Sequence, residues 1–318
     1  MTGFVSHLGP EIAAFLTFKR ALGYPYVRAE FTLRDFDRFV AGHRRGRRAF
    51  RLDDAILAWL ASKRDRKPVT VTVELGVVRQ FCSYRRRQDP TAFVPGRIWA
   101  PQSTESQFLP HVFTDGQVRE LLRRAKSLTS PPFRGIVFHT LLLVLYCTGL
   151  RFGEALHLRM RDVDIDGRLF FITESKGRSR WVPFERSLAR ELERYLAARR
   201  RRAAAGPNER FFIRLDGRDL TVPAASDTIR ELLRAAGMKP SAGRVGPRPY
   251  DIRHTFAVHR LTRWYRAGVD INGRLPWLSA YMGHNDLLGT ESYLTATPEL
   301  LAIAGRRFER HLSRRRRS

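Results

Sequence analysis

A tyrosine near the end of the chain could act as a nucleophile, because a histidine precedes it at a short interval. The stretch from Tyr281 to Tyr293 contains Gly283-His284, then Thr290, and Tyr293 nine residues after that histidine. A His, a Thr and a Tyr near a helix end are usually packing and capping residues. This stretch alone is therefore weak support for chemistry.

Three basic segments upstream strengthen the case for a reaction. They are Thr148-Gly-Leu-Arg151-Phe-Gly-Glu154, Glu174-Ser-Lys176-Gly-Arg178 and Tyr250-Asp-Ile-Arg253-His254-Thr-Phe256. Each of these basic residues, taken singly, is more often structural than catalytic. The order Arg, Lys, Arg, His, Tyr is harder to explain by structure alone, and it indicates a phenol nucleophile with cations that hold a phosphate.

Attack of Tyr293 on a phosphodiester would give a covalent phosphotyrosine. The pentacoordinate phosphorus carries extra negative charge, which preorganised cations stabilise. Arg151 and Arg253 can each hold two oxygens through the guanidinium fork. His284 could donate another hydrogen bond or handle the phenol proton. Lys176, unlike an arginine, can give up a proton to the leaving 5′-oxygen.

This scheme needs no metal and no other cofactor, and the sequence offers no obvious metal site. The only two cysteines, Cys82 and Cys147, fall in apolar helical patterns, so we expect buried free thiols in a reducing compartment. Asp162 to Gly167 imitates the start of a calcium-binding loop, but Thr173 occupies the position of the closing Glu. We interpret that segment as a surface turn.

The charge of the chain points to a polyanionic partner. It has 58 Lys and Arg against 31 Asp and Glu, a formal net charge of +27, and nucleic acid is the usual partner of such a chain. Only six of the 58 are lysines; a GC-rich genome would explain this, and the arginine fork also suits phosphate. With no apolar run of membrane-spanning length and no signal peptide, we expect a cytoplasmic, nucleoid-associated bacterial protein and no membrane partner.

The length and composition predict two globular domains. The chain has 318 residues, of which 43% are hydrophobic. Apolar periodicity predicts four helices within residues 1–90, with Phe15, Phe36 and Trp59 among the buried positions. The stretch from Asp89 to Pro110 contains four prolines and few periodic apolar residues. We interpret residues 91–110 as an interdomain linker.

Residues 111–310 predict a mostly helical second domain with a small antiparallel β-sheet. Thr114 is a candidate N-cap, and an apolar helix over 136–147 should end at Gly149. Strand-like runs at 168–172 and 180–184 predict a hairpin with Lys176 near its tip, and 211–213 a short third strand. Further helices are expected over 188–202, 226–236, 251–267, 275–282 and 298–310, before a basic tail at 311–318. The expected fold class is mainly α with a small antiparallel sheet.

These motifs resemble those of the tyrosine recombinase family, also called phage-type integrases. The matching segments are Thr-Gly-Leu-Arg-x-x-Glu at 148–154, Ser-Lys-Gly-Arg at 175–178, Asp-Ile-Arg-His-Thr-Phe at 251–256 and Gly-His…Thr…Tyr at 283–293. The resemblance covers most of residues 113–310, and residues 1–90 resemble the family's helical, SAM-like core-binding domain more loosely. It implies that the core-binding and catalytic domains close around double-stranded DNA as a clamp.

The resemblance also implies a reaction and partners. Tyr293 would form a 3′-phosphotyrosine, a free 5′-hydroxyl would attack it in turn, and recombination would proceed through a four-way junction. Arg151, Lys176, Arg253 and His284 would carry the family's catalytic roles. Because members of the family act as tetramers on paired sites, we expect a homo- or hetero-tetramer, with sister recombinases as candidate partners.

Two features depart from the family pattern. Tyr250 stands three residues before Arg253, where the family usually has a histidine, and a phenol is a poor base near neutral pH. Arg253 and His284 are 31 residues apart, which is longer than the compact family pattern. The longer form, with Thr-Pro-Glu-Leu-Leu after the tyrosine, is similar to the subgroup encoded by bacterial transposons that carry several recombinases together.

Three alternative functions compete with an active recombinase of a mobile element. Tyr250 motivates the first, a catalytically impaired DNA-binding accessory subunit of a multi-recombinase complex. The second is a type IB topoisomerase, which uses the same chemistry without strand exchange. The third, a basic RNA-binding protein, rests on charge alone. Salt-sensitive binding would not separate them, because phosphate contacts dominate in all of them.

Overall fold

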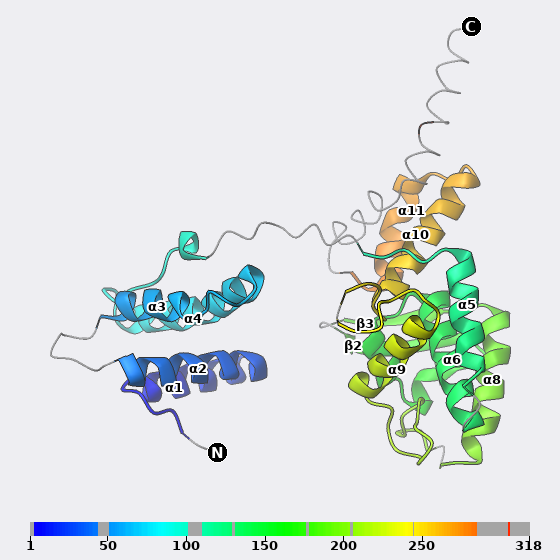
Figure 1. Ribbon diagram of the computed structural model, residues 1–318, viewed down its shortest axis with the longest axis horizontal. Helices are drawn as coiled ribbons and strands as arrows, with labels where there is room; N and C mark the ends of the chain where they lie inside the picture. The colour runs from blue at the N-terminus through cyan, green and yellow to red at the C-terminus, as the bar shows by residue number, and fades with distance from the viewer. Residues whose placement is uncertain are drawn as a thin grey trace, which may run out of the picture. The chain divides into compact units, whose positions relative to one another are not determined.

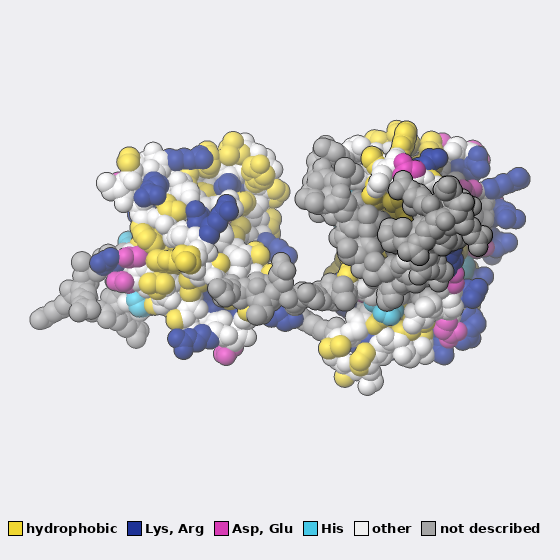
Figure 2. Space-filling view, turned by 90° about the horizontal axis from the view of Figure 1, so that it is seen from above, with side chains coloured by type: hydrophobic (Ala, Val, Ile, Leu, Met, Phe, Trp, Pro, Cys, Tyr) yellow, Lys and Arg dark blue, Asp and Glu magenta, His cyan; other side chains and the backbone are white. Residues whose placement is uncertain are grey.

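The chain divides into two compact units, Met1–Phe108 and Leu109–Ser318. The computed structural model describes residues 3–43, 51–100, 110–128, 131–175, 178–203, 206–243, 245–284 and 305. As predicted, the fold is mainly α-helical with a small antiparallel sheet (Figure 1). Lys and Arg side chains appear on the visible surface of both units and outnumber Asp and Glu there (Figure 2).

The described residues of the first unit form four α-helices, as the apolar periodicity predicts. They are α1 (Gly9–Ala21), α2 (Val27–His43), α3 (Leu52–Ala61) and α4 (Pro68–Gln88). Each helix contributes its apolar stripe to one core, in which Phe15, Phe36, Trp59 and Phe81 are fully buried. The polar faces of the helices are thereby left to carry the basic side chains.

The first part of the predicted linker packs against this unit. Phe93, Val94, Trp99 and Ala100 lie against the core of the first unit, and a short 3-10 helix, η1 (Arg97–Trp99), lies in the same stretch. Residues 101–109 lie outside the described residues. The function of 91–110 as an interdomain linker therefore stays a prediction.

The second unit is built around one apolar helix. Its helices are α5 (Asp115–Lys126), α6 (Pro132–Thr148), α7 (Phe152–His157), η2 (Met160–Asp162), α8 (Arg186–Arg200), α9 (Val222–Ala235), α10 (Asp251–Arg266) and α11 (Ile271–Met282). α6 packs against α5, α8 and α10 (Figure 1), which explains why it is apolar on all sides. Thr114 caps α5 as expected, because its side chain accepts the Gln117 N–H at 3.2 Å.

Three antiparallel strands form the sheet. They are β1 (Val163–Asp164), β2 (Leu169–Ser175) and β3 (Arg178–Pro183), in the order β1-β2-β3. The β2–β3 pairing confirms the predicted hairpin and sets Ile172 opposite Arg180. The turn between β1 and β2 confirms the expected surface turn, since Gly167 N–H donates to Asp164 Oδ1 at 2.8 Å.

The prediction of a third strand at 211–213 is wrong, because the third strand is β1. Ile213 makes only an isolated bridge with Asp219. Side chains of α8 bind the backbone of this segment instead: Tyr195 Oη–H donates to Phe211 O at 2.7 Å, and Ile213 N–H donates to Tyr195 Oη at 3.2 Å. Arg199, fully buried, also donates to Phe211 O at 3.2 Å. An extended segment whose backbone groups bind side chains cannot form a ladder.

Two helices begin four residues earlier than predicted. α9 begins at Val222, because Thr221 caps it by accepting the Ala224 N–H at 3.4 Å. α11 begins at Ile271, where the side chain of Asp270 accepts two backbone N–H groups of the first turn, at 3.0 and 3.2 Å. Pro276 lies inside α11, beyond its first turn.

α10 and α11 form a smaller cluster beside the main core (Figure 1). Phe256, Leu261, Leu278 and Met282 are buried in it, and Tyr281 touches both clusters. The helix predicted over 298–310 and the tail at 311–318 lie outside the described residues, apart from residue 305. Within the described part of the chain, no helix has both the length and the apolar character that crossing a membrane requires.

Replacing Tyr195 with phenylalanine tests the account of the 211–213 segment. The substitution keeps the ring but removes the oxygen that accepts the buried Ile213 N–H. We expect the free energy of unfolding, measured by urea titration, to fall by about 1–3 kcal/mol.

Tyr84→Phe is the matched control. Tyr84 Oη accepts from the side chain of Gln88 at an exposed site, so its loss should change stability by less than about 0.5 kcal/mol. Equal losses in the two variants would contradict the proposed role of Tyr195.

Candidate active site

The segment that carries Arg151 begins with a sharp turn at the end of α6. Gly149 adopts the left-handed conformation, with φ 61°, and its N–H donates to Leu145 O at 2.9 Å. A Cβ at this position would lie 2.2 Å from the ring of Phe256. Glycine is therefore required both by the backbone and by the contact with α10, and this contact fixes the first arginine segment against the second.

Arg253 is buried within the second unit and binds the backbone of two other elements. From the first turn of α10, its Nη1 donates to Gly149 O at 2.6 Å and its Nη2 donates to Met282 O at 2.8 Å. The side chain is among the largest that are fully buried. A buried guanidinium held at both Nη atoms has a fixed plane.

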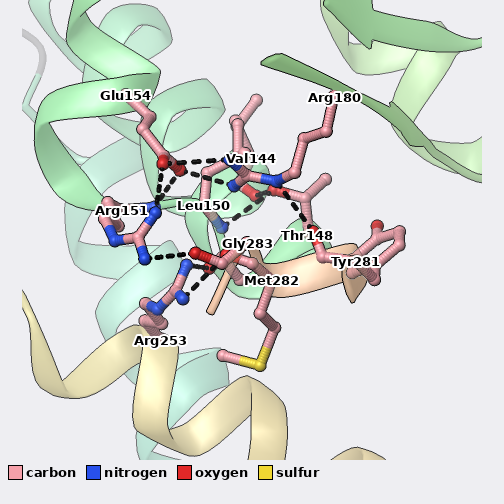
Figure 3. A network of polar contacts seen from close by, with 11 residues as sticks. Val144, Thr148, Leu150, Arg151, Glu154, Arg180, Arg253, Tyr281, Met282 and Gly283 are labelled. Carbon is pink, nitrogen blue, oxygen red and sulfur yellow. Dashed lines mark hydrogen bonds and ion pairs between the residues drawn. The ribbon is translucent and has the colours of Figure 1, made fainter. Parts of the chain in front are cut away.

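Arg151 precedes α7 and lies close to Arg253. Its Nη1 donates to Glu154 Oε1 at 2.7 Å, and its backbone N–H donates to Glu154 Oε2 at 2.9 Å. Its Nη2 donates to Gly283 O, at the end of α11. Arg151 thus links the start of α7 to the turn that carries His284 (Figure 3).

The end of α11 follows a Schellman motif. Gly283 is left-handed, with φ 70°, its N–H donates to Ala280 O at 3.0 Å, and His284 N–H donates to Ser279 O at 3.0 Å. This motif provides donors for the carbonyls of Ser279 and Ala280. The carbonyls of the next three residues, Tyr281, Met282 and Gly283, still need donors.

Three arginines provide those donors, one for each carbonyl. Arg180 Nε donates to Tyr281 O at 3.0 Å, Arg253 Nη2 to Met282 O, and Arg151 Nη2 to Gly283 O. Figure 3 shows the three guanidinium groups converging on this turn from three different elements. Cations at a helix C-terminus also interact favourably with the helix dipole. We call this arrangement the α11 clasp.

Arg180 is the residue that the sequence analysis missed, because it was considered only as part of a strand. Its Nη1 and Nη2 donate to the two oxygens of Glu154 at 3.1 and 2.8 Å. A signal was present in the alternation of β3: Arg180 lies two residues from the buried Val182 and therefore on the inward face. A charge at an inward position of a strand requires a partner.

Tyr250 lies at the start of α10, one turn from the partly buried His254. The residue is 42% exposed, and its ring meets the ring of His254 edge-on, with 5.1 Å between the ring centroids. Burial lowers the pKa of His254, so this histidine is neutral near pH 7. The turn before α10 is held by the fully buried Asp251, which accepts from Arg248 N–H at 2.8 Å.

The structure brings Arg151, Arg253 and His284 to one end of α11, and Tyr250 to the start of the helix that carries Arg253. Lys176 and Tyr293 lie outside the described residues, and the catalytic roles of all six stay predictions. In the described part of the chain, no group of three or more His, Cys, Asp or Glu is placed to hold a metal ion.

The geometry defines a mostly helical protein with a cationic site that suits phosphate. The sequence matches the model of the Phage integrase family over residues 111–299. It is 32% identical over 305 residues to the protein named integrase/recombinase y4rB of Sinorhizobium fredii, covering 94% of this chain and 96% of that protein. This chain therefore belongs to the Phage integrase family, whose members are tyrosine recombinases.

Two further similarities agree with this assignment. The tyrosine recombinase XerC of Staphylococcus saprophyticus is 26% identical over 271 residues, covering 85% of each chain. The solved structure of the Tn1549 transposon integrase in complex with transposon right end DNA superposes with a TM-score of 0.66 at 16% identity, covering 93% of this chain and 98% of that one. At this identity the superposition supports the fold alone.

Replacing Gly283 with alanine should destabilise the protein more than the same change at another left-handed glycine. A Cβ on Gly283 would lie 2.6 Å from Arg180 Cζ, so the strain of the left-handed backbone adds to displacement of the clasp. We expect a loss of about 2–4 kcal/mol, of which about 1–2 kcal/mol is backbone strain. Thermal or urea unfolding measures it.

Gly237→Ala provides the control. Gly237 follows α9 with φ 68°, and nothing lies within 4 Å of a Cβ built there, so it should lose only the backbone part. Equal losses at the two glycines would show that the contact with Arg180 does not matter for stability.

Two histidines, the buried His139 and the partly buried His254, should make stability depend on pH. Burial lowers the pKa of His139 and of His254 below the usual value of about 6.5. The unfolded state then binds protons more readily, so their contribution is present above about pH 6.5 and is lost as the pH falls below it. The free energy of unfolding should decrease between about pH 7.5 and 5.5, and His139→Leu should reduce that slope. An unchanged slope would contradict the assignment to His139.

Proposed function

We propose that this protein is a site-specific DNA recombinase or integrase of a mobile element. It cuts and rejoins DNA through a 3′-phosphotyrosine on Tyr293, without a metal ion. The observation that supports this most strongly is the α11 clasp, because it assembles Arg151 and Arg253 beside the turn of His284, nine residues before Tyr293. Membership in the Phage integrase family supports the same reaction class and argues against the topoisomerase and RNA-binding alternatives.

The roles of the residues follow from their chemistry. Arg151 and Arg253 stabilise the charge on the non-bridging oxygens, with guanidinium planes that the protein has already fixed. His284 donates a hydrogen bond or handles the phenol proton, and Lys176 protonates the leaving 5′-oxygen. Tyr250, at the start of α10, can donate a hydrogen bond to the same phosphate but is a poor base.

The partner is double-stranded DNA, held by a helical core-binding domain at residues 1–90 and a catalytic domain at 111–310. The net charge of +27 supports phosphate contacts by both domains. The protein would act as a tetramer on paired sites, with sister recombinases as candidate subunits. The long spacing from Arg253 to His284 and the Thr-Pro-Glu-Leu-Leu segment after Tyr293 favour a mobile element, with the transposon-encoded multi-recombinase subgroup as the proposed branch.

A second function is a catalytically impaired accessory subunit that binds DNA within a multi-recombinase complex. The specific observation behind it is Tyr250, a phenol at the position where the family usually has histidine. This alternative predicts binding without covalent capture.

A suicide-substrate assay tests the proposal. Nicked duplexes from the DNA that flanks the gene are incubated with the wild-type protein and with Tyr293→Phe, in EDTA, and covalent adducts are separated on denaturing gels. We expect an adduct with the wild type and none with Tyr293→Phe, since the variant lacks the attacking oxygen. Tyr250→His should raise the rate of adduct formation by about 10-fold or more, as expected for a better proton-handling group.

Each outcome has a distinct meaning. Adduct formation that survives Tyr293→Phe would assign the nucleophile elsewhere, and an adduct that requires a divalent cation would overturn the metal-free scheme. DNA that is bound and shifted without an adduct would favour the accessory subunit, and addition of the neighbouring recombinases would be the next arm. Relaxation of supercoiled plasmid without a specific site would favour the topoisomerase.

A further inference from the structure

Arg180 is fully engaged within the protein and yet belongs to the candidate active site. Its side chain is 11% exposed. Nε binds Tyr281 O, and Nη1 and Nη2 bind the two oxygens of Glu154. Figure 3 shows it reaching Glu154 from β3, while Arg151 approaches the same carboxylate from the residue before α7. A guanidinium bound in this way can influence a reaction on DNA through its neighbours, without contacting the DNA itself.

Glu154 shows what Arg180 does electrostatically. Its side chain is 5% exposed, and each of its oxygens accepts two hydrogen bonds, one from Arg151 and one from Arg180. These four bonds fill the acceptor sites of a carboxylate. Without Arg180, a buried carboxylate would pair with Arg151 alone, and Arg151 would turn toward a bidentate pair with it. The second arginine therefore keeps Arg151 available for a phosphate.

Arg180 also fixes the turn that precedes His284. Its bond to Tyr281 O and the bond from Tyr281 Oη–H to Pro183 O, at 2.9 Å, attach the last turn of α11 to β3. The bare Cα of Gly283 lies against the guanidinium, since a Cβ there would be 2.6 Å from Arg180 Cζ. A shift of Arg180 would therefore move the backbone on which His284 is placed.

We propose that Arg180 is a positioning residue for DNA cleavage. It holds the turn of His284 and balances Glu154, so that Arg151 is directed at the scissile phosphate. This inference rests on the proposed recombinase function. It predicts that Arg180 variants carry out the chemical step more slowly but bind DNA with unchanged affinity.

The experiment compares Arg180→Gln, Arg180→Lys and the double variant Arg180→Gln/Glu154→Gln with the wild type. The probe is the nicked duplex from the DNA flanking the gene. Equilibrium binding and the single-turnover rate of adduct formation at saturating protein are measured separately, so that affinity and chemistry are resolved. Hydrogen exchange at the amides of Gly283 and His284 reports the turn in the DNA-free protein. The control is Arg194→Gln, which breaks an ion pair with Glu191 on a side chain that is 69% exposed.

We expect Arg180→Gln to slow adduct formation about 100-fold, as a small misplacement of catalytic groups does, with binding changed less than about twofold. The two amides should exchange faster. Arg180→Lys should recover only part of the rate, because an ammonium cannot bind Glu154 and Tyr281 O together. The double variant should be faster than Arg180→Gln, since it removes the unbalanced carboxylate. Arg194→Gln should match the wild type in every readout.

Several results would overturn the proposal. One is an unchanged adduct rate in a folded Arg180→Gln variant, and another is an equal loss of binding and rate. A double variant slower than Arg180→Gln would overturn the claim that Arg180 balances the charge of Glu154. Unchanged exchange of the two amides would overturn the claim that Arg180 holds the turn of His284. If the wild type itself forms no adduct, the proposed function fails and the role in cleavage fails with it, while the exchange measurement still decides whether Arg180 holds the turn.

Discussion

The site depends on how the protein satisfies the backbone carbonyls at the end of α11. A helix that ends in a buried turn leaves carbonyls without donors, and each unmet group is costly. The Schellman motif at Gly283 provides donors for two of these carbonyls, and each arginine of the α11 clasp provides a donor for one more. Because these arginines come from β3, the N-cap of α7 and α10, one helix end joins the elements that carry the candidate chemistry.

The same constraint explains why arginine, and not lysine, stands at all three positions. Each side chain must bind a carbonyl and a second group in a fixed plane: Glu154 for Arg151 and Arg180, and Gly149 O for Arg253. Only a fork with several donors can do both. Three guanidiniums against one buried carboxylate leave excess positive charge, which a folded protein tolerates where an anion binds. The structural role and the affinity for phosphate therefore arise from one arrangement.

Much of this could be predicted from the sequence, for reasons that particular residues make clear. Helical periodicity placed Phe36 and Trp59 in the first core, and motif spacing singled out Arg151, Arg253 and His284, which meet at one helix end. The role of Arg180 could not be found in that way, because its partners lie 26 and 101 residues away in sequence. The segment 211–213 misled strand prediction since hydrogen bonds from Tyr195 and Arg199 leave no local pattern. The prediction starts α11 four residues late, although Asp270, whose side chain caps the helix, is a local signal in the sequence.

Tyr250 lies three residues before Arg253 of the α11 clasp in sequence. Its phenol is exposed at the first turn of α10, on the helix whose Arg253 is held at both ends. The partly buried His254, one turn along, has a lowered pKa, and a neutral histidine can donate one hydrogen bond but carries no extra proton to release near pH 7. A scheme with Tyr250 must therefore take its charge stabilisation from the arginines and its proton transfer from other groups. The extent to which the clasp fixes those arginines then determines how well a phenol can replace a histidine at this position.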